Sequence, residues 1–295
     1  MSVEIREPRA DEAALIAELI NEHANAAFGE TEIAEAEVRH WFGMSDVWIR
    51  VAERDGQVVG YVDAVQRRGG AVELDIRTVD REAAATLLAA AQEHASPKPI
   101  SMRVVVQGDD ELLRELVEAD GWQPVRHSYQ MRIELQDDLP APGWPEGIAV
   151  RTMQPGEEER VYEANNAAFA DDWYFQQQPF ERWRSDAFGR EDFDPTLVWL
   201  AEDDGELAGV SANSWHFSGD PRFGWVGILG VLPRWRRRGL ATALLQQSFR
   251  DFRERGATRV GLGVDAQNTT GAVQLYERVG MYVARRNDTY EKRLS

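Results

Sequence analysis

The residues best suited to chemistry form a short basic segment in the second half of the chain. The segment, from Pro233 to Thr242, reads PRWRRRGLAT and holds four arginines within five positions. Apolar residues at helical spacing follow it, so a helix begins at or near these arginines. Because a helix N-terminus favours anions over cations, the arginines fit a bound anion better than they fit the helix itself. We therefore predict that this loop binds a diphosphate, with the arginines as its counter-ions.

The residues around this segment support the same prediction. The preceding strand, FGWVGILGVL, is interrupted by Gly227 and Gly230. Glycine inside a strand often marks a bulge or the close approach of another backbone or a ligand. After the arginines, Gly239 and Ala241 are small enough to leave the backbone N–H groups of the helix start open.

Two segments resemble motifs of the GNAT N-acetyltransferase superfamily. Arg236-x-x-Gly239-x-Ala241, preceded by Val231-x-Pro233, resembles its acyl-CoA diphosphate loop, and VDAQNTTGAVQLYERVGM (264–281) resembles its later motif. The resemblance implies acetyl-CoA as the acyl donor, Asn268 near its pantetheine and nucleotide part, and Tyr276 as general acid. The residues implied to bind the cofactor are Leu229, Gly230, Val231, Arg236, Arg237, Arg238, Gly239, Leu240, Ala241, Thr242 and Asn268.

The implied reaction is acetyl transfer to a primary amine of a small-molecule acceptor. The backbone amides around Leu229 to Val231 would polarise the thioester carbonyl, and Tyr276 would protonate the departing thiolate. No metal is needed, and the sequence has no His or Asp cluster with ligand spacing. The alternative is a catalytically silent CoA-binding sensor or scaffold module. Nucleotide binding by a P-loop is not expected, because no Lys-Ser/Thr follows Gly239.

The general base is the main departure from the family pattern. Relatives often carry a glutamate early in the strand before the loop, whereas this chain has Trp225 near that place. His216, Asp220, Asp171 and Asp172 are candidate substitutes, and a water relay to a distant carboxylate is equally open.

An aromatic segment, DDWYFQQQPFERW (171–183), lies where the family's acceptor loop usually sits. Its aromatic side chains could receive an amine through shape and cation–π contact, or they could simply pack a helix onto the sheet. Both interpretations stay open for Trp173, Phe175, Phe180 and Trp183.

The elements that position these residues occur twice along the chain. Each half predicts a strand, a helix, a hairpin around an Asp-Gly turn (Asp55-Gly56 and Asp204-Gly205), then strand, helix, strand, helix and a closing strand. In the second half the strands are 148–153, 196–203, 206–217, 223–232, 259–264 and 282–294, and the helices are 156–169, 237–255 and 270–279. We predict an α+β fold of tandem duplicated GNAT-like domains, each a mixed, mostly antiparallel sheet with helices on both faces.

The two predicted domains differ in their motifs. Residues 1–136 form the first domain, 137–146 a proline-rich linker and 147–295 the acyl-CoA-binding, catalytic domain. The first domain lacks both cofactor motifs, with no glycine at the loop position and acidic Asp80 and Glu82 at the helix start, where they would repel a diphosphate. We expect it to act as a scaffold.

Composition limits the partners. The net charge is −18, and residues 1–140 hold 14 Lys+Arg against 28 Asp+Glu, a balance of −14. So acidic a surface predicts neither nucleic acid nor anionic membrane as a partner. No cysteine, no signal peptide and no apolar run of ~18 residues favour a soluble cytoplasmic protein, whose oligomeric state the sequence leaves open.

Overall fold

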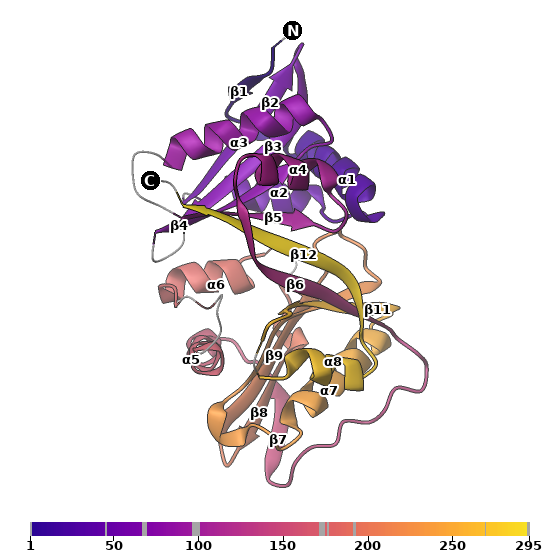
Figure 1. Cartoon of the computed structure of the whole chain (residues 1–295). Helices are drawn as coiled ribbons and strands as arrows, with labels where there is room; N and C mark the ends of the chain where they lie inside the picture. Colours follow the sequence, from indigo (N-terminus) through magenta and orange to yellow (C-terminus); the bar gives the residue numbers. More distant parts are fainter. Residues whose placement is uncertain are drawn as a thin grey trace. The chain divides into compact units, whose positions relative to one another are not determined.

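The structure is a computed structural model, and it describes residues 2–44, 46–66, 70–95, 101–170, 175, 177–190, 193–268 and 270–293. The chain forms two compact units (Figure 1). Unit 1 comprises Met1–Ser128, Phe217–Gly219 and Arg285–Ser295, and unit 2 comprises Tyr129–His216 and Asp220–Ala284.

Unit 1 is a mixed sheet with helices on both faces. Its strands are β1 (Glu4–Arg6), β2 (Val47–Arg54), β3 (Gln57–Gln66), β4 (Ala71–Arg77), β5 (Ser101–Gln107) and part of β12 (Tyr282–Arg293), in that order across the sheet. Only β4 and β5 are parallel among the pairs described in this unit. Its helices are α1 (Ala13–Phe28), α2 (Glu35–Phe42), α3 (Arg81–Ala95) and α4 (Glu111–Ala119).

Unit 2 repeats this plan. Its sheet order is β6 (Gln123–Glu134), β11 (Arg259–Asp265), β10 (Phe223–Val231), β9 (Glu206–Trp215), β8 (Val198–Asp203) and β7 (Ile148–Thr152). The pair β10–β11 is parallel and the pairs from β10 to β7 are antiparallel. Its helices are α5 (Glu158–Phe169), α6 (Phe180–Phe188), α7 (Leu240–Glu254) and α8 (Ala272–Arg278). The mostly antiparallel α+β prediction is confirmed.

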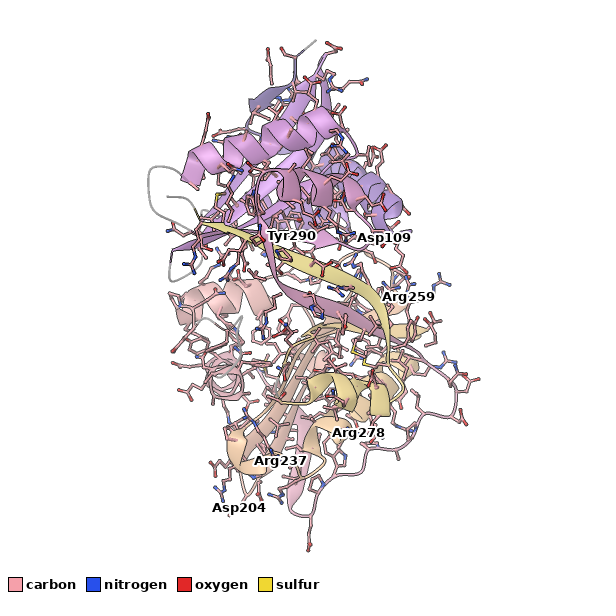
Figure 2. All side chains as sticks on the ribbon, in the orientation of Figure 1. Asp109, Asp204, Arg237, Arg259, Arg278 and Tyr290 are labelled. Carbon is pink, nitrogen blue, oxygen red and sulfur yellow. The ribbon has the colours of Figure 1, made fainter. Side chains whose placement is uncertain are left out.

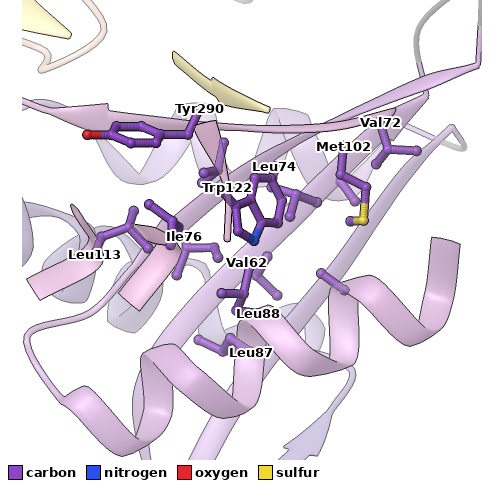
Figure 3. Close-up of a cluster of buried hydrophobic side chains, with 14 of the residues drawn as sticks. Val62, Val72, Leu74, Ile76, Leu87, Leu88, Met102, Leu113, Trp122 and Tyr290 are labelled. Carbon is purple, nitrogen blue, oxygen red and sulfur yellow. The ribbon is translucent and has the colours of Figure 1, made fainter. Parts of the chain in front are cut away.

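Alternating side chains explain why helices cover both faces of each sheet. In β3 of unit 1, Tyr61 packs in a cluster with α1 and α2, whereas Val62 packs in a cluster with α3. Figure 3 shows the second cluster, in which Trp122 and Tyr290 lie among aliphatic side chains. Tyr290 is 4% exposed and comes from β12, so the last strand of the chain completes the core of unit 1.

The last strand of each half is exchanged between the units. Residues Asn287 to Arg293 of β12 pair antiparallel with β5 in unit 1. Residues 129–134 of β6 belong instead to unit 2, where the Leu135 N–H donates to the Thr258 carbonyl at 2.8 Å. The compact units therefore differ from the predicted ranges 1–136 and 147–295.

The predicted linker, residues 137–146, contains no helix or strand. It lies within unit 2, and Arg250 of α7 donates to the Leu139 carbonyl at 3.2 Å. The segment is thus held against unit 2 rather than connecting the two compact units.

A repeated ion network supports the duplication. In unit 1, Arg6 at the end of β1 pairs with Glu12 at 2.7 Å and with Glu53 at 2.6 Å. In unit 2, Arg151 near the end of β7 makes the corresponding pairs, with Glu157 at 2.6 Å and with Glu202 at 2.8 Å.

Three elements differ from the predictions. The short helices α2 and α6 were not predicted, because neither carries a long periodic pattern. The helix predicted over 237–255 begins at Leu240, three residues later. Its start is delayed because Arg237 (φ 61°) and Gly239 (φ 85°) have left-handed backbone conformations, which an α-helix cannot contain.

Candidate active site

The site in unit 2 is built on two parallel strands that diverge. Their register runs from the pair Phe223–Arg259 to the pair Trp225–Gly261, after which β10 continues to Val231. The Leu232 N–H donates to the Ala208 carbonyl on the β9 side. Because N–H directions alternate along a strand, the N–H groups of Leu229 and Val231 face the β11 side.

The glycines of β10 have different packing roles. A Cβ on Gly224 would lie 2.6 Å from the Phe252 ring, and one on Gly230 would lie 3.0 Å from the Cβ of Ala168 in α5. Gly227 lies at a register shift between Val226 and Ile228, where β10 bulges against β9. The predicted bulge is present, and the space beside Gly230 is taken by α5.

The loop after β10 ends at an uncapped helix. It comprises a 3-10 turn, Pro233–Trp235, the left-handed residues Arg237 and Gly239, and then α7. Among the described residues, none provides a side-chain cap for α7 or accepts from the N–H groups of residues 239–242. These four N–H groups are open at the helix start, a geometry that suits an anion.

Arg236 holds the loop in place. Its Nε donates to the Val231 carbonyl at 3.1 Å, and its Nη2 donates to the Ala168 carbonyl at 2.9 Å. The guanidinium thereby joins the end of β10 to the last turn of α5, where a cation is favoured by the helix dipole.

Asp203, at the end of β8, contacts the same loop. Its Oδ2 accepts from the buried Trp235 Nε1 at 2.7 Å and lies 3.6 Å from Arg238 Nη1. Beside it, Arg234 pairs with Glu206 at 2.8 Å. Three of the four loop arginines therefore already have partners.

Arg237 differs from these three. Its side chain is exposed, and it has no hydrogen bond or ion pair with any residue that the structure describes. Figure 2 shows it at the end of unit 2 that also carries Asp204. A left-handed backbone at a non-glycine residue costs of order 1 kcal/mol and is found preferentially at functional sites.

Tyr276 on α8 has a buried ring. The residue is 8% exposed and packs against the apolar cluster beneath α7 and α8. Burial raises the pKa of its hydroxyl to about 12, so the group is protonated at neutral pH.

Asn268 shapes the turn before α8. Its Oδ1 accepts from the Thr270 N–H at 2.7 Å and from the Thr270 hydroxyl, and its own N–H donates to the Asp265 carbonyl at 3.1 Å. The side chain therefore takes part in an Asx turn between β11 and α8.

The candidate bases have structural partners or lie outside the described residues. His216 is 4% exposed, stacks on Phe223 at 4.1 Å and meets Trp225 edge-on at 5.2 Å. Asp220 pairs with Arg259 at 3.2 Å. Asp171 and Asp172 lie outside the described residues.

The aromatic segment contributes to the core where it is described. Trp183 is 8% exposed, and its ring lies 5.3 Å from Tyr162 and 5.1 Å from Phe188. Phe180 lies 5.4 Å from the Tyr162 ring. These contacts match the packing interpretation for Phe180 and Trp183. Phe175 is half-buried, and Trp173 lies outside the described residues.

The corresponding helix start in unit 1 is occupied by its own carboxylate. Asp80 Oδ1 accepts from the Ala83 N–H at 2.9 Å, in the first turn of α3. Arg54, at the end of β2, donates to Asp80 and, at 2.7 Å, to Glu82. The amides that would face a phosphate thus already have an anionic partner.

The described residues provide neither a cluster of metal ligands nor a membrane-spanning helix. No group of three or more His, Asp or Glu side chains among them could hold a metal ion. None of the described helices has the length and apolar character that crossing a membrane requires.

Comparisons with known proteins agree with this geometry. Residues 159–281 match the acetyltransferase (GNAT) family. A mycothiol acetyltransferase from Salinispora arenicola is 35% identical over 245 residues, covering 79% of this chain and 77% of that protein. One from Streptomyces coelicolor is 35% identical over 180 residues, covering 61% of this chain. That match spans only 57% of the Streptomyces coelicolor protein's own length.

A solved structure extends the similarity to both units. The crystal structure of a GCN5-related N-acetyltransferase from Sphaerobacter thermophilus is 31% identical, with a TM-score of 0.79. The match covers 99% of this chain and 95% of that chain. The predicted family is confirmed: this chain belongs to the GNAT family of acetyltransferases.

Proposed function

We infer that this chain transfers an acetyl group from acetyl-CoA to a primary amine of a small-molecule acceptor, with the cofactor held by unit 2. The observation that carries the inference is the uncapped start of α7 beside the diverging strands β10 and β11. Its four N–H groups and the unpartnered Arg237 side chain suit a diphosphate.

The proposed chemistry assigns one task to each group. The acceptor nitrogen attacks the thioester carbonyl carbon, and the N–H groups of Leu229 and Val231 donate to the carbonyl oxygen as it becomes negative. The carbon–sulfur bond then breaks, and the Tyr276 hydroxyl gives its proton to the departing sulfur. The attacking nitrogen loses one proton to solvent water as the amide forms. Asn268 would shape the turn beside the pantetheine arm.

The first acceptor to test follows from the relatives. Those cited above are named mycothiol acetyltransferases, so we propose an amine related to mycothiol as the first member of a panel of small amines. Unit 1 is proposed to be a scaffold without cofactor, because Asp80 occupies its helix start.

One observation favours a second function, a CoA-binding module without turnover. Trp225 stands near the family glutamate position, and His216 is stacked on Phe223. An amine that cannot lose its proton does not attack a thioester, so such a chain would bind acyl-CoA without consuming it.

Two measurements separate these functions. Calorimetric titration with acetyl-CoA is expected to give one site per chain, and thiol release with the amine panel is expected to detect turnover. Binding without thiol release for any amine would support the module. Two equivalent sites, or no binding at all, would contradict the inference.

A further inference from the structure

We propose that Asp203 is a resident counter-ion of the cofactor loop, and that Arg238 exchanges Asp203 for the diphosphate when acyl-CoA binds. Asp203 would then set how tightly the cofactor is held. The proposal rests on the proposed function of this loop, and it assigns a role to a residue of the neighbouring hairpin.

The first support is the fixed position of the carboxylate. Trp235 is 2% exposed, and its indole N–H donates to Asp203 Oδ2 at 2.7 Å. Because the indole ring is held by packing, the carboxylate is held beside the loop whether or not a ligand is present. Asp203 is thus one fixed negative charge at a site proposed to receive two phosphates.

The second support is the geometry of the ion pair. Arg238 Nη1 lies 3.6 Å from Asp203 Oδ2, and the two side chains are 43% and 29% exposed. An exposed pair at that distance is weak, so the arginine can leave it for a doubly charged partner at little cost.

The third support comes from the duplicated unit. Arg54 and Asp203 are the last residues of β2 and β8, each directly before the Asp-Gly turn of its hairpin. Arg54 pairs with the acidic residues Asp80 and Glu82 in the loop of unit 1. Each unit therefore joins its hairpin to its loop through opposite charges, and the signs are reversed between the units.

The reversal has a consequence for binding. In unit 1 the loop's own Asp80 fills the helix start, so no phosphate competes there for Arg54. In unit 2 the helix start is open, and Asp203 both orders Arg238 and repels an incoming phosphate. At the distances of neighbouring side chains in a partly exposed site, one such charge alters affinity by about 2- to 10-fold.

The test is Asp203→Asn, which keeps an oxygen for the Trp235 N–H but removes the charge. We expect CoA to bind about 2- to 10-fold more tightly by calorimetry, with pantetheine, which has no phosphate, unchanged. In an Arg238→Gln background the same substitution should tighten CoA binding less, because only the repulsion between Asp203 and the phosphates is then relieved. A purely structural role would instead lower the melting temperature and weaken both ligands.

Glu206→Gln is the matched control. It removes one negative charge from the same hairpin, but Glu206 pairs with Arg234 rather than with Arg238. Equal tightening by Glu206→Gln, or unchanged or weaker CoA binding by Asp203→Asn, would overturn the proposal. Failure of the proposed cofactor site is distinguishable, since the wild-type chain would then bind no CoA.

Discussion

At the scale of single residues, Tyr276 is a buried tyrosine on α8. Its pKa, raised by burial to about 12, keeps the proton available at neutral pH. Tyr276→Phe keeps the ring and removes the proton. We expect thiol release at saturating acetyl-CoA to fall by roughly 10²–10⁴-fold, with acetyl-CoA affinity little changed.

Tyr282→Phe is the control for this substitution, because Tyr282 is 49% exposed on β12 and its hydroxyl donates to Glu134. Its turnover should equal that of the wild type. Turnover of Tyr276→Phe within about threefold of wild type would remove Tyr276 from the mechanism.

Substitutions of two adjacent arginines should distinguish a role in ligand binding from a role in stability. Arg237 has a φ of 61° and no partner among the described residues, so Arg237→Gly removes a cation at a backbone conformation that glycine adopts freely. We expect about 10- to 100-fold weaker CoA binding, unchanged pantetheine binding and no loss of melting temperature.

Arg236→Gln should differ from Arg237→Gly by also lowering stability. It removes two hydrogen bonds to the Val231 and Ala168 carbonyls, so the melting temperature should fall along with the affinity. Equal loss of CoA and pantetheine in Arg237→Gly would show that Arg237 does not contact phosphate.

The sequence predicted these residue types but not their division of labour. The motif resemblance grouped Arg236, Arg237 and Arg238 as cofactor ligands. One of the two carbonyls that accept from Arg236 belongs to Ala168, which is 68 positions away in the chain. Likewise, Asp203 was not predicted, although comparing Arg54-Asp55-Gly56 with Asp203-Asp204-Gly205 would have revealed the charge reversal beside the two loops.

At the scale of elements, the loss of stability caused by replacing a glycine of β10 should depend on which glycine is replaced. Gly224→Ala would place a Cβ 2.6 Å from the Phe252 ring, whereas a Cβ on Gly227 meets only the Ala212 carbonyl, at 3.5 Å. We expect urea unfolding to show a loss of about 1–3 kcal/mol for Gly224→Ala. Gly227→Ala, the matched control, should change stability far less, and a larger loss there would contradict this packing argument.

The element predictions succeeded where periodicity and end signals agreed. The second helix in the order predicted for the first half corresponds to α3, whose start is fixed by the Asp80 carboxylate. The helix predicted from Arg237 was wrong at its start, because apolar spacing does not report the sign of φ at Arg237. Helix α6 has only nine residues, and its apolar positions are mostly aromatic, so no apolar period identified it.

At the scale of the whole molecule, the repeated ion networks should make stability depend on pH. Hydrogen bonds from Arg151 lower the pKa of Glu157 to about 2, and those from Arg6 do the same for Glu12. Because these folded-state values lie below the ordinary glutamate pKa, their stabilisation is complete above about pH 4.5 and is lost as the pH falls towards 2.

Glu157→Gln should therefore cost about 1–2 kcal/mol at pH 7 and roughly half of that or less at pH 3, as measured by urea unfolding. Its control is Glu159→Gln, which removes an exposed carboxylate two positions away on the same helix. An equal cost for Glu157→Gln at both pH values would contradict the linkage.

The duplication itself could be predicted, because both halves show the same order of periodic segments and the same Asp-Gly turns. The exchange of β6 and β12 could not, since a strand has the same sequence pattern whichever sheet it joins. The proline-rich segment 137–146 was a reasonable boundary by composition, but composition does not report which strand follows β5 in the sheet.

The exchange also sets an order of events during translation. Unit 1 needs residues 287–293 to cover β5, and these are made after all of unit 2. While the ribosome is still synthesising residues 129–284, the edge of β5, with its three consecutive valines, lacks its final partner. An unpaired strand edge of this kind recruits other chains, so we expect the amino-terminal half to be prone to aggregation until residues 287–293 have been synthesised.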